Sequence, residues 1–312
     1  MVDRKLLIGT RGSPLALWQA GHVRALLIAA HGLGDDAVAL SVITTSGDRI
    51  RDKPLRDFGG KGLFTKEIDE ALLDSAVDLA VHSMKDLHTE LPQGILIAAV
   101  LPRGDVRDAF ISAKRESLAA LPPGAVVGSS SLRRQAQVKR LRPDLEVIDF
   151  RGNVETRLEK LEQGKADATL LAIAGLTRLG LTDHITSILS TDEMLPAVAQ
   201  GAIGISCRSD DAKTRDLLQA VNDDKTATTV ACERAFLAQL DGSCRTPIAG
   251  LAEIAEGALR FRGLVLTPQG TEWHEIERRG LPEDAISLGA ESGRELLALA
   301  GPNFLASLTS RL

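Results

Sequence analysis

The chain has 312 residues, of which 44% are hydrophobic, 25% are charged and 3% are aromatic, with no tyrosine. This balance is typical of a soluble globular protein of two or three domains, and it excludes a disordered chain. The net charge of -5 and the scarcity of aromatic rings argue against a nucleic-acid binder, which needs a basic surface and rings on which bases stack.

The seven apolar runs between residue 4 and about residue 205 alternate with helical patterns, which predicts an α/β fold with largely parallel sheets. The predicted strands are 4–9, 39–44, 78–82, 95–100, 125–128, 146–150 and 168–173. Ser13 is predicted to cap the first helix, with Pro14 in its first turn. Residues 45–62 contain four glycines, a proline and many charges, so we expect a mobile loop that covers a site.

The pattern changes after about residue 221. One helix is predicted to run to Leu240, followed by strands that are broken at Glu256-Gly257 and at 268–270, and by a helix near 283–299. This arrangement predicts a small C-terminal α+β domain.

The sequence lacks features that are typical of exported and membrane proteins. The apolar stretch at 6–10 is too short for a signal peptide, and no later run is long enough to cross a membrane. The cysteines Cys207, Cys232 and Cys244 are odd in number and form no C-x-x-C motif. We therefore expect a cytoplasmic protein without a disulfide framework, a zinc site or a membrane partner.

Cationic residues follow five of the predicted strands, at the position where open α/β sheets bind their ligands. They are Arg11, Lys85, Arg133 with Arg134, Arg151, and Arg178. Any one of them is explained by a surface charge or a salt bridge. The whole set instead predicts a cleft between domains that binds a ligand with several carboxylate or phosphate groups.

Arg133 and Arg134 are the most informative pair, because residues 129–131 are serines that cap the next helix and place both guanidiniums in its first turn. Cations are unfavourable at a helix N-terminus unless an anion lies among them. Lys139, Arg140 and Arg142 lie at the opposite end of this helix, where a structural role explains them.

Asp86 and Cys244 are the candidate chemical groups. Asp86 follows a buried strand at the same edge as the cations, where it either forms a salt bridge with Lys85 or Arg11 or stabilises a cationic intermediate and relays protons. Cys244 lies on a loop beside Arg245, so it is either a nucleophile or a spectator thiol. Cys207 and Cys232 are predicted to be buried and inert.

Eight stretches of the chain resemble the porphobilinogen deaminase (hydroxymethylbilane synthase) family over essentially its whole length. They are TRGSPLALWQA (10–20), GGKGLFTKEID (59–69), AVHSMKD (80–86), GSSSLRRQ (128–135), RGNVETRL (151–158), LAIAGLTRLG (171–180), LPAVAQGAIGI (195–205) and GSCRTPI (242–248).

The resemblance implies three domains. Two α/β lobes similar to those of periplasmic binding proteins would comprise 1–101 with 202–220 (domain 1) and 102–201 (domain 2). Domain 3, at 221–312, would be α+β and carry the cofactor cysteine. The resemblance also implies a monomer that joins four porphobilinogens head to tail with loss of ammonia and then hydrolyses off hydroxymethylbilane.

The resemblance also implies roles for individual residues. Cys244 would hold a dipyrromethane cofactor through a thioether, and Asp86 would stabilise the azafulvene cation that loss of ammonia leaves. The implied cofactor-binding residues are Cys244, Asp86, Ser83, Lys85, Ser131, Arg133 and Arg134. The implied substrate-binding residues are Arg11, Ser13, Gln19, Lys61, Phe64, Arg151, Arg157 and Arg178.

The chain departs from the family at two positions. Asp57 replaces a common lysine, whose contact neighbouring Arg56 would have to supply, and Ser243 replaces a common glycine before Cys244. The rival classes are a non-catalytic solute-binding protein with two lobes and a nucleic-acid binder that uses 131–142 as a basic helix. The N-terminus argues against the first class, and the acidic net charge argues against the second.

Overall fold

The computed structural model describes residues 5–49, 64–240 and 246–309. The chain divides into two compact units. Unit 1 comprises residues 1–104 and 201–227, and unit 2 comprises 105–200 and 228–312. The division of unit 2 into domains 2 and 3 remains a proposal.

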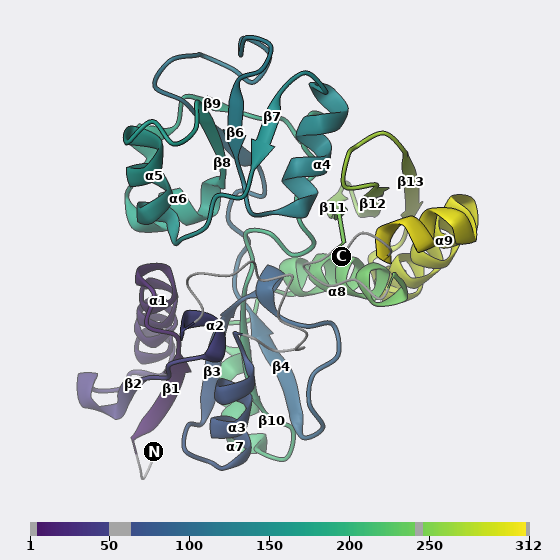
Figure 1. The fold of residues 1–312 in the computed structure, drawn as a ribbon. Coiled ribbons are helices and arrows are strands. Elements are labelled where there is room, and N and C mark those ends of the chain that lie inside the picture. Colours follow the sequence, from purple (N-terminus) through teal and green to yellow (C-terminus); the bar gives the residue numbers. More distant parts are fainter. Residues whose placement is uncertain (1–4, 50–63, 241–245, 310–312) are drawn as a thin grey trace. The chain divides into compact units, whose positions relative to one another are not determined.

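Unit 1 is a five-stranded sheet with helices on both faces (Figure 1). Its elements are β1 (Leu6–Thr10), α1 (Pro14–His31), β2 (Val38–Val42), α2 (Ser46–Arg49), α3 (Lys66–Leu73), β3 (Leu79–Ser83), a 3-10 turn (Met84–Asp86), β4 (Ile95–Val100), β10 (Ile203–Arg208) and α7 (Ala212–Gln219). The strand order is β2-β1-β3-β10-β4. The pairs among β2, β1 and β3 are parallel, whereas β10 is antiparallel to both of its neighbours.

Side chains alternate between the two faces of this sheet, as the two-residue period of a strand requires. Leu79 and Val81 of β3 pack with α1 and α7, whereas Ala80 packs with α3 on the other face. Ser13 caps α1 as predicted, because its hydroxyl accepts a hydrogen bond from the Ala16 N–H at 3.3 Å.

Unit 2 begins with a second sheet of the same plan, in the order β7-β6-β8-β5-β9. Its elements are β5 (Asp108–Ile111), β6 (Val126–Gly128), α4 (Leu132–Leu141), β7 (Glu146–Ile148), α5 (Val154–Glu162), β8 (Ala168–Ala172), α6 (Ile173–Leu179) and β9 (Ser187–Ile188). Phe110 and Leu170 pack on the face that α4 covers, and Ala109 and Leu171 pack on the face of α5 and α6.

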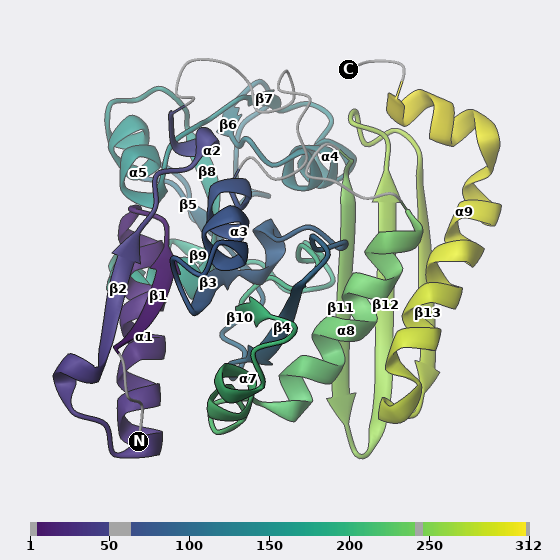
Figure 2. The same ribbon diagram turned by 90° about the horizontal axis from the view of Figure 1, so that it is seen from below.

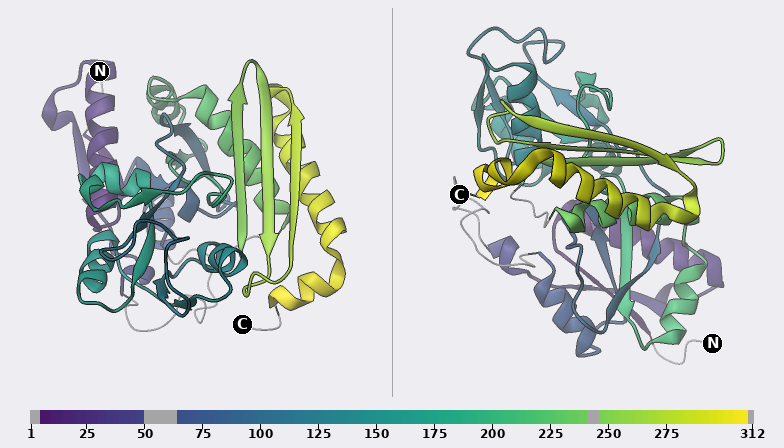
Figure 3. Two further views of the ribbon diagram at one scale, coloured as in Figure 1. Left: turned by 90° about the horizontal axis from the view of Figure 1, so that it is seen from above. Right: turned by 90° about the vertical axis from the view of Figure 1, so that its right-hand side faces the viewer.

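The C-terminal part of unit 2 is a three-stranded antiparallel sheet of β11 (Ile248–Ala255), β12 (Ala258–Leu266) and β13 (Trp273–Gly280). Glu256 and Gly257 both have positive φ in the hairpin between β11 and β12. Helices α8 (Asp224–Gln239) and α9 (Ala285–Thr309) lie on one face of this sheet (Figures 2 and 3), and Ala136 of α4 packs against the other.

The predicted fold class is confirmed, and all seven predicted strands lie within two residues of observed ones. The sheets were predicted to be largely parallel, but two of the four strand pairings in each five-stranded sheet are antiparallel. This part of the prediction was wrong. Residues 46–49 of the predicted loop form α2, and residues 50–63 lie outside the described residues. No helix among the described residues is long and apolar enough to cross a membrane.

Candidate active site

A pocket of unit 1 lies at the carboxyl edge of β1 and β3 and at the start of α1. Six of the predicted site residues line it: Arg11, Ser13, Gln19, Phe64, Ser83 and Asp86. Because β1 and β3 are parallel neighbours, the residues that follow Thr10 and Ser83 emerge at the same edge of the sheet. The cavity that these residues enclose has a volume of about 70 Å³.

Asp86 is exposed at this edge, and its carboxylate has no hydrogen bond or ion pair to any described residue. The alternative that Asp86 forms a salt bridge with Lys85 or Arg11 is therefore not observed. Asp86 lies in the 3-10 turn after β3, and the N–H of Met84 in that turn donates to the Ala202 carbonyl at 3.1 Å. The turn is thus held to the segment before β10 while the Asp86 carboxylate stays available.

Two neighbours of Asp86 bond each other instead. The Gln19 amide donates to the Ser83 hydroxyl at 2.9 Å, which connects α1 to the end of β3. His82 is buried, and its Nε2 lies 2.8 Å from the Ser206 hydroxyl of β10. His82 is therefore a packed strand residue.

Arg11 already has a carboxylate partner within the chain. Its Nη2 lies 2.5 Å from Oδ1 of Asp48, and its guanidinium stacks on Phe64, with Cζ at 4.2 Å from the ring centroid. Lys85 is half-buried in the turn that carries Asp86 and does not line the pocket.

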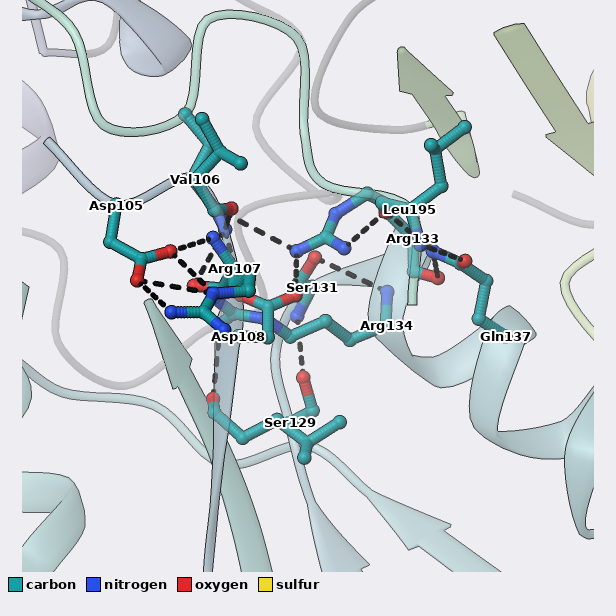
Figure 4. Close-up of polar contacts among 12 residues, drawn as sticks. Asp105, Val106, Arg107, Asp108, Ser129, Ser131, Arg133, Arg134, Gln137 and Leu195 are labelled. Carbon is teal, nitrogen blue, oxygen red and sulfur yellow. Dashed lines mark hydrogen bonds and ion pairs between the residues drawn. The ribbon is translucent and has the colours of Figure 1, made fainter. Parts of the chain in front are cut away.

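The arginine pair of unit 2 is buried around one carboxylate (Figure 4). Arg133 and Arg134 are 4% and 5% exposed, and Asp108 is fully buried between them. The Nη2 atoms of Arg133 and Arg134 lie 2.7 Å from Oδ2 and Oδ1 of Asp108, respectively. The Nη1 atoms donate to the carbonyls of Leu195 at 2.7 Å and Leu170 at 3.0 Å.

This cluster carries a positive charge that its own residues do not balance, since two guanidiniums share one carboxylate. Burial alone would raise the pKa of Asp108, but the two arginines outweigh it and hold that pKa well below its usual range. Burial lowers the pKa of Arg133, with Asp108 opposing the shift. The Nε–H groups of Arg133 and Arg134 are buried without a hydrogen-bond partner among the described residues. Each arginine therefore has one N–H group that could donate to a ligand.

The anion that the helix N-terminus requires is therefore Asp108, a residue that sequence reasoning missed. Asp108 begins β5 and pairs with Ala172 at the end of β8, so an antiparallel strand brings it to the carboxyl edge of the sheet. Gln200 supports the same carboxylate, with its amide 2.8 Å from Oδ1. The short apolar run that follows Asp108 was the only sequence signal for this strand.

Three further predicted site arginines of unit 2 lie at the same sheet edge or on the helices that follow it. Arg151 comes after β7, and its Nη1 is buried without a hydrogen-bond partner among the described residues. Arg157 lies on α5, where its Nε donates to the Asn153 carbonyl at 3.2 Å. Arg178 lies in the last turn of α6, and burial lowers its pKa to about 10, so it remains protonated at neutral pH.

Ser131 acts as the N-cap of α4, because its hydroxyl accepts from the Arg134 N–H at 3.4 Å. Lys139, Arg140 and Arg142 at the other end of α4 form structural contacts. Arg140 pairs with Glu275 and stacks on Trp273, and Lys139 and Arg142 donate to backbone carbonyls.

Two of the three cysteines lie within the described residues, and both are buried as predicted. Cys207 and Cys232 are buried, and burial raises the pKa of their thiols to about 11 and about 12. Thiols with such pKa values do not ionise at neutral pH. Cys244 and Ser243 lie outside the described residues, as do Arg56, Asp57 and Lys61 of the predicted loop.

Two models of known protein families match this chain, one in its N-terminal part and one in its C-terminal part. Residues 6–216 match "Porphobilinogen deaminase, dipyromethane cofactor binding domain", and residues 227–298 match "Porphobilinogen deaminase, C-terminal domain". The chain belongs to the porphobilinogen deaminase family.

Two porphobilinogen deaminases support this membership. A porphobilinogen deaminase of Paracoccus denitrificans is 56% identical over 297 residues, which cover 95% of each chain. A chloroplastic porphobilinogen deaminase of Oryza sativa subsp. japonica is 55% identical over 307 residues, covering 96% of this chain and 86% of that protein. A solved periplasmic substrate-binding protein from Coxiella burnetii is 14% identical with a TM-score of 0.44, covering 73% of this chain and 96% of that one.

Proposed function

We propose that this chain carries out the reaction of its family on porphobilinogen. It condenses four porphobilinogen molecules head to tail with release of ammonia, and it then hydrolyses off the linear tetrapyrrole hydroxymethylbilane. The observation that carries this proposal is the Asp86 carboxylate, which lines the pocket of unit 1 without a hydrogen bond or ion pair among the described residues. Such a carboxylate is available to stabilise a cation that forms beside it.

The donor groups of unit 2 fit a cofactor made of carboxylate-bearing pyrroles. The arginine pair has one positive charge more than Asp108 neutralises, and both Nε–H groups lack partners among the described residues. When bound, dipyrromethane supplies the two-ring primer to which the first substrate is joined. We assign its thioether to Cys244 and its polar contacts to Asp86, Ser83, Lys85, Ser131, Arg133 and Arg134.

Porphobilinogen carries an acetate and a propionate on its ring, so we expect cations and hydroxyl or amide donors among its binding residues, with Phe64 covering one face of the Arg11 guanidinium. We assign this binding to Arg11, Ser13, Gln19, Lys61, Phe64, Arg151, Arg157 and Arg178. Arg178 suits the role because it is partly desolvated yet charged, and Arg151 suits it because its Nη1 lacks a partner among the described residues. We further propose a cytoplasmic monomer that needs no metal, membrane or nucleic acid.

Intact-mass measurement of the purified protein tests the cofactor assignment. The expected mass exceeds that of the bare sequence by two pyrrole rings, and adding porphobilinogen produces further steps of one ring each. A Cys244→Ser variant is expected to show the bare mass and no activity. A wild-type protein with the bare mass after native expression would contradict the assignment.

Substitution of Asp86 tests the catalytic assignment. Asp86→Asn keeps the shape but removes the charge, so we expect turnover to fall by a factor on the order of 100 or more. The two-ring mass should be retained, because the variant alters charge rather than the fold. Asp36→Asn, at an exposed site in the same unit, is the matched control. Near-normal turnover of Asp86→Asn would remove Asp86 from the mechanism.

A further inference from the structure

Arg11 is bound on one edge by a carboxylate of the chain itself. Its Nη2 lies 2.5 Å from Oδ1 of Asp48, and its Nε lies 3.2 Å and 3.3 Å from Oδ1 and Oδ2. This is a side-on arginine–carboxylate pair, which uses the Nε–H and one N–H of Nη2. The Phe64 ring covers one face of the guanidinium.

Asp48 is itself fixed, so the pair is a built feature rather than a chance surface contact. Its Oδ2 accepts hydrogen bonds from the Thr45 hydroxyl at 2.7 Å and the Thr45 N–H at 3.3 Å. The helix α2 that carries Asp48 is tied to α3, because Ser46 donates its N–H to Glu67 at 2.9 Å. Both Arg11 and Asp48 are about three-quarters buried, with side chains 25% and 24% exposed.

Asp48 keeps its charge at neutral pH. Burial alone would raise its pKa, but the hydrogen bonds from Arg11 and Thr45 outweigh that effect and lower the pKa below its usual value. Arg11 therefore faces the pocket as half of a neutral pair, although it still has the two N–H groups of Nη1 and one of Nη2 to offer.

A ligand carboxylate that binds these remaining N–H groups shares the guanidinium with Asp48. Two carboxylates on one guanidinium lie only a few ångströms apart and repel each other, and partial burial weakens the screening of that repulsion. The affinity of Arg11 for a ligand carboxylate is thus lower than it would be without Asp48.

We propose that Asp48 is an internal competitor of the substrate carboxylate at Arg11 and thereby sets the affinity for substrate. This inference rests on the proposed function. In a reaction that adds several carboxylate-bearing rings at one site, each carboxylate must leave the cation that bound it. Asp48 neutralises Arg11 whenever a ligand carboxylate departs, so release does not leave a partly buried cation without a counter-ion.

Asp48→Asn tests the inference, because asparagine has the same shape and retains an oxygen for Arg11 while losing the charge. We expect the KM for porphobilinogen to fall about three- to tenfold, with no increase in kcat. If Asp48 only held Arg11 in position, its replacement would raise KM or lower kcat. A lower KM therefore distinguishes competition for Arg11 from positioning of Arg11. Asp48→Ala also removes the charge and is expected to lower KM, which keeps the test decisive if the first variant folds poorly.

Two further variants complete the experiment. Asp48→Glu restores the charge and is expected to bring KM back toward the wild-type value. Asp35→Asn removes an exposed partner of Arg24, 3.7 Å away in the same unit, and is expected to leave KM unchanged. An unchanged or raised KM in both charge-removing variants, with an active wild type, would overturn the inference. A wild type without turnover would instead overturn the proposed function, and this inference with it.

Discussion

Asp108 shows how one buried carboxylate determines the geometry of two candidate ligand-binding arginines. Adjacent residues on a helix point in different directions, about 100° apart around its axis. One carboxylate with an oxygen for each guanidinium makes the side chains of Arg133 and Arg134 converge. The cost of burying three charges is offset only while every partner is present.

Removing the Asp108 carboxylate should therefore strongly destabilise the folded protein. Asp108→Asn leaves two buried guanidiniums without a counter-charge, and we expect the free energy of unfolding to fall by about 3–5 kcal/mol. Asp105→Asn is the control, because Asp105 pairs with Arg107 at 2.6 Å but both side chains are partly exposed. We expect a change of at most about 1 kcal/mol there. Urea unfolding of the two variants measures the contrast, and equal losses would refute the special role of Asp108.

At the scale of elements, the position of α9 depends on small residues that face α8. A Cβ atom added to Gly289 would lie 2.0 Å from the Cys232 carbonyl oxygen, and one on Gly293 would lie 2.9 Å from that of Phe236. These obstacles are backbone atoms, which cannot rotate away. The two helices can approach closely here because α9 has no side chain at positions 289 and 293.

Gly289→Ala should therefore push α9 away from α8 and destabilise the protein by about 1–3 kcal/mol. Gly21→Ala provides the opposite case, since nothing lies within 4 Å of its added Cβ in α1. There we expect a gain of about 0.5–1 kcal/mol, because alanine is the better helix former. Thermal unfolding midpoints would measure both changes, and a Gly289→Ala variant as stable as the wild type would contradict this account of the helix packing.

At the scale of the whole molecule, buried ionisable groups set how stability depends on pH. Burial raises the pKa of Asp69 on α3 from 3.8 to about 6, although a hydrogen bond from Thr65 opposes the shift. Asp69 is 7% exposed, and its Oδ1 has no hydrogen-bond partner among the described residues. The folded state thus holds the Asp69 proton more tightly than the unfolded state does.

Because the folded pKa is the higher one, the stabilisation from protonated Asp69 is fully present below about pH 4 and is lost as pH rises through 6. Asp69→Asn removes this loss, so the variant should gain stability relative to the wild type between pH 5 and pH 7.5, by up to about 3 kcal/mol. Asp74→Asn, at an exposed position at the end of the same helix, is the matched control. Unfolding midpoints of the variant and the wild type at pH 5 and pH 7.5 test this prediction. If the difference between Asp69→Asn and the wild type is the same at both pH values, the pKa of Asp69 is not raised.

Local sequence patterns were sufficient for seven strands and for the edge where the candidate site lies, but they did not predict β5, β9 or β10. Apolar runs predicted seven strands, Ser13 and Pro14 marked the start of α1, and the cations after the strands identified the carboxyl edges. These features depend on neighbours within a few residues, so periodicity and capping chemistry reveal them. The ordered motifs added the family, with Asp86 and Cys244 as its candidate chemical groups.

The partners of the arginines were decided only by the tertiary structure. Asp108 reaches Arg133 and Arg134 through β5, an antiparallel strand of four residues, and Asp48 reaches Arg11 across 37 residues of chain. Such pairings depend on strand order and on which edge a returning strand meets, and no local period records them. A charged residue in a sequence shows what it can bind, whereas the fold decides whether a neighbour already occupies it.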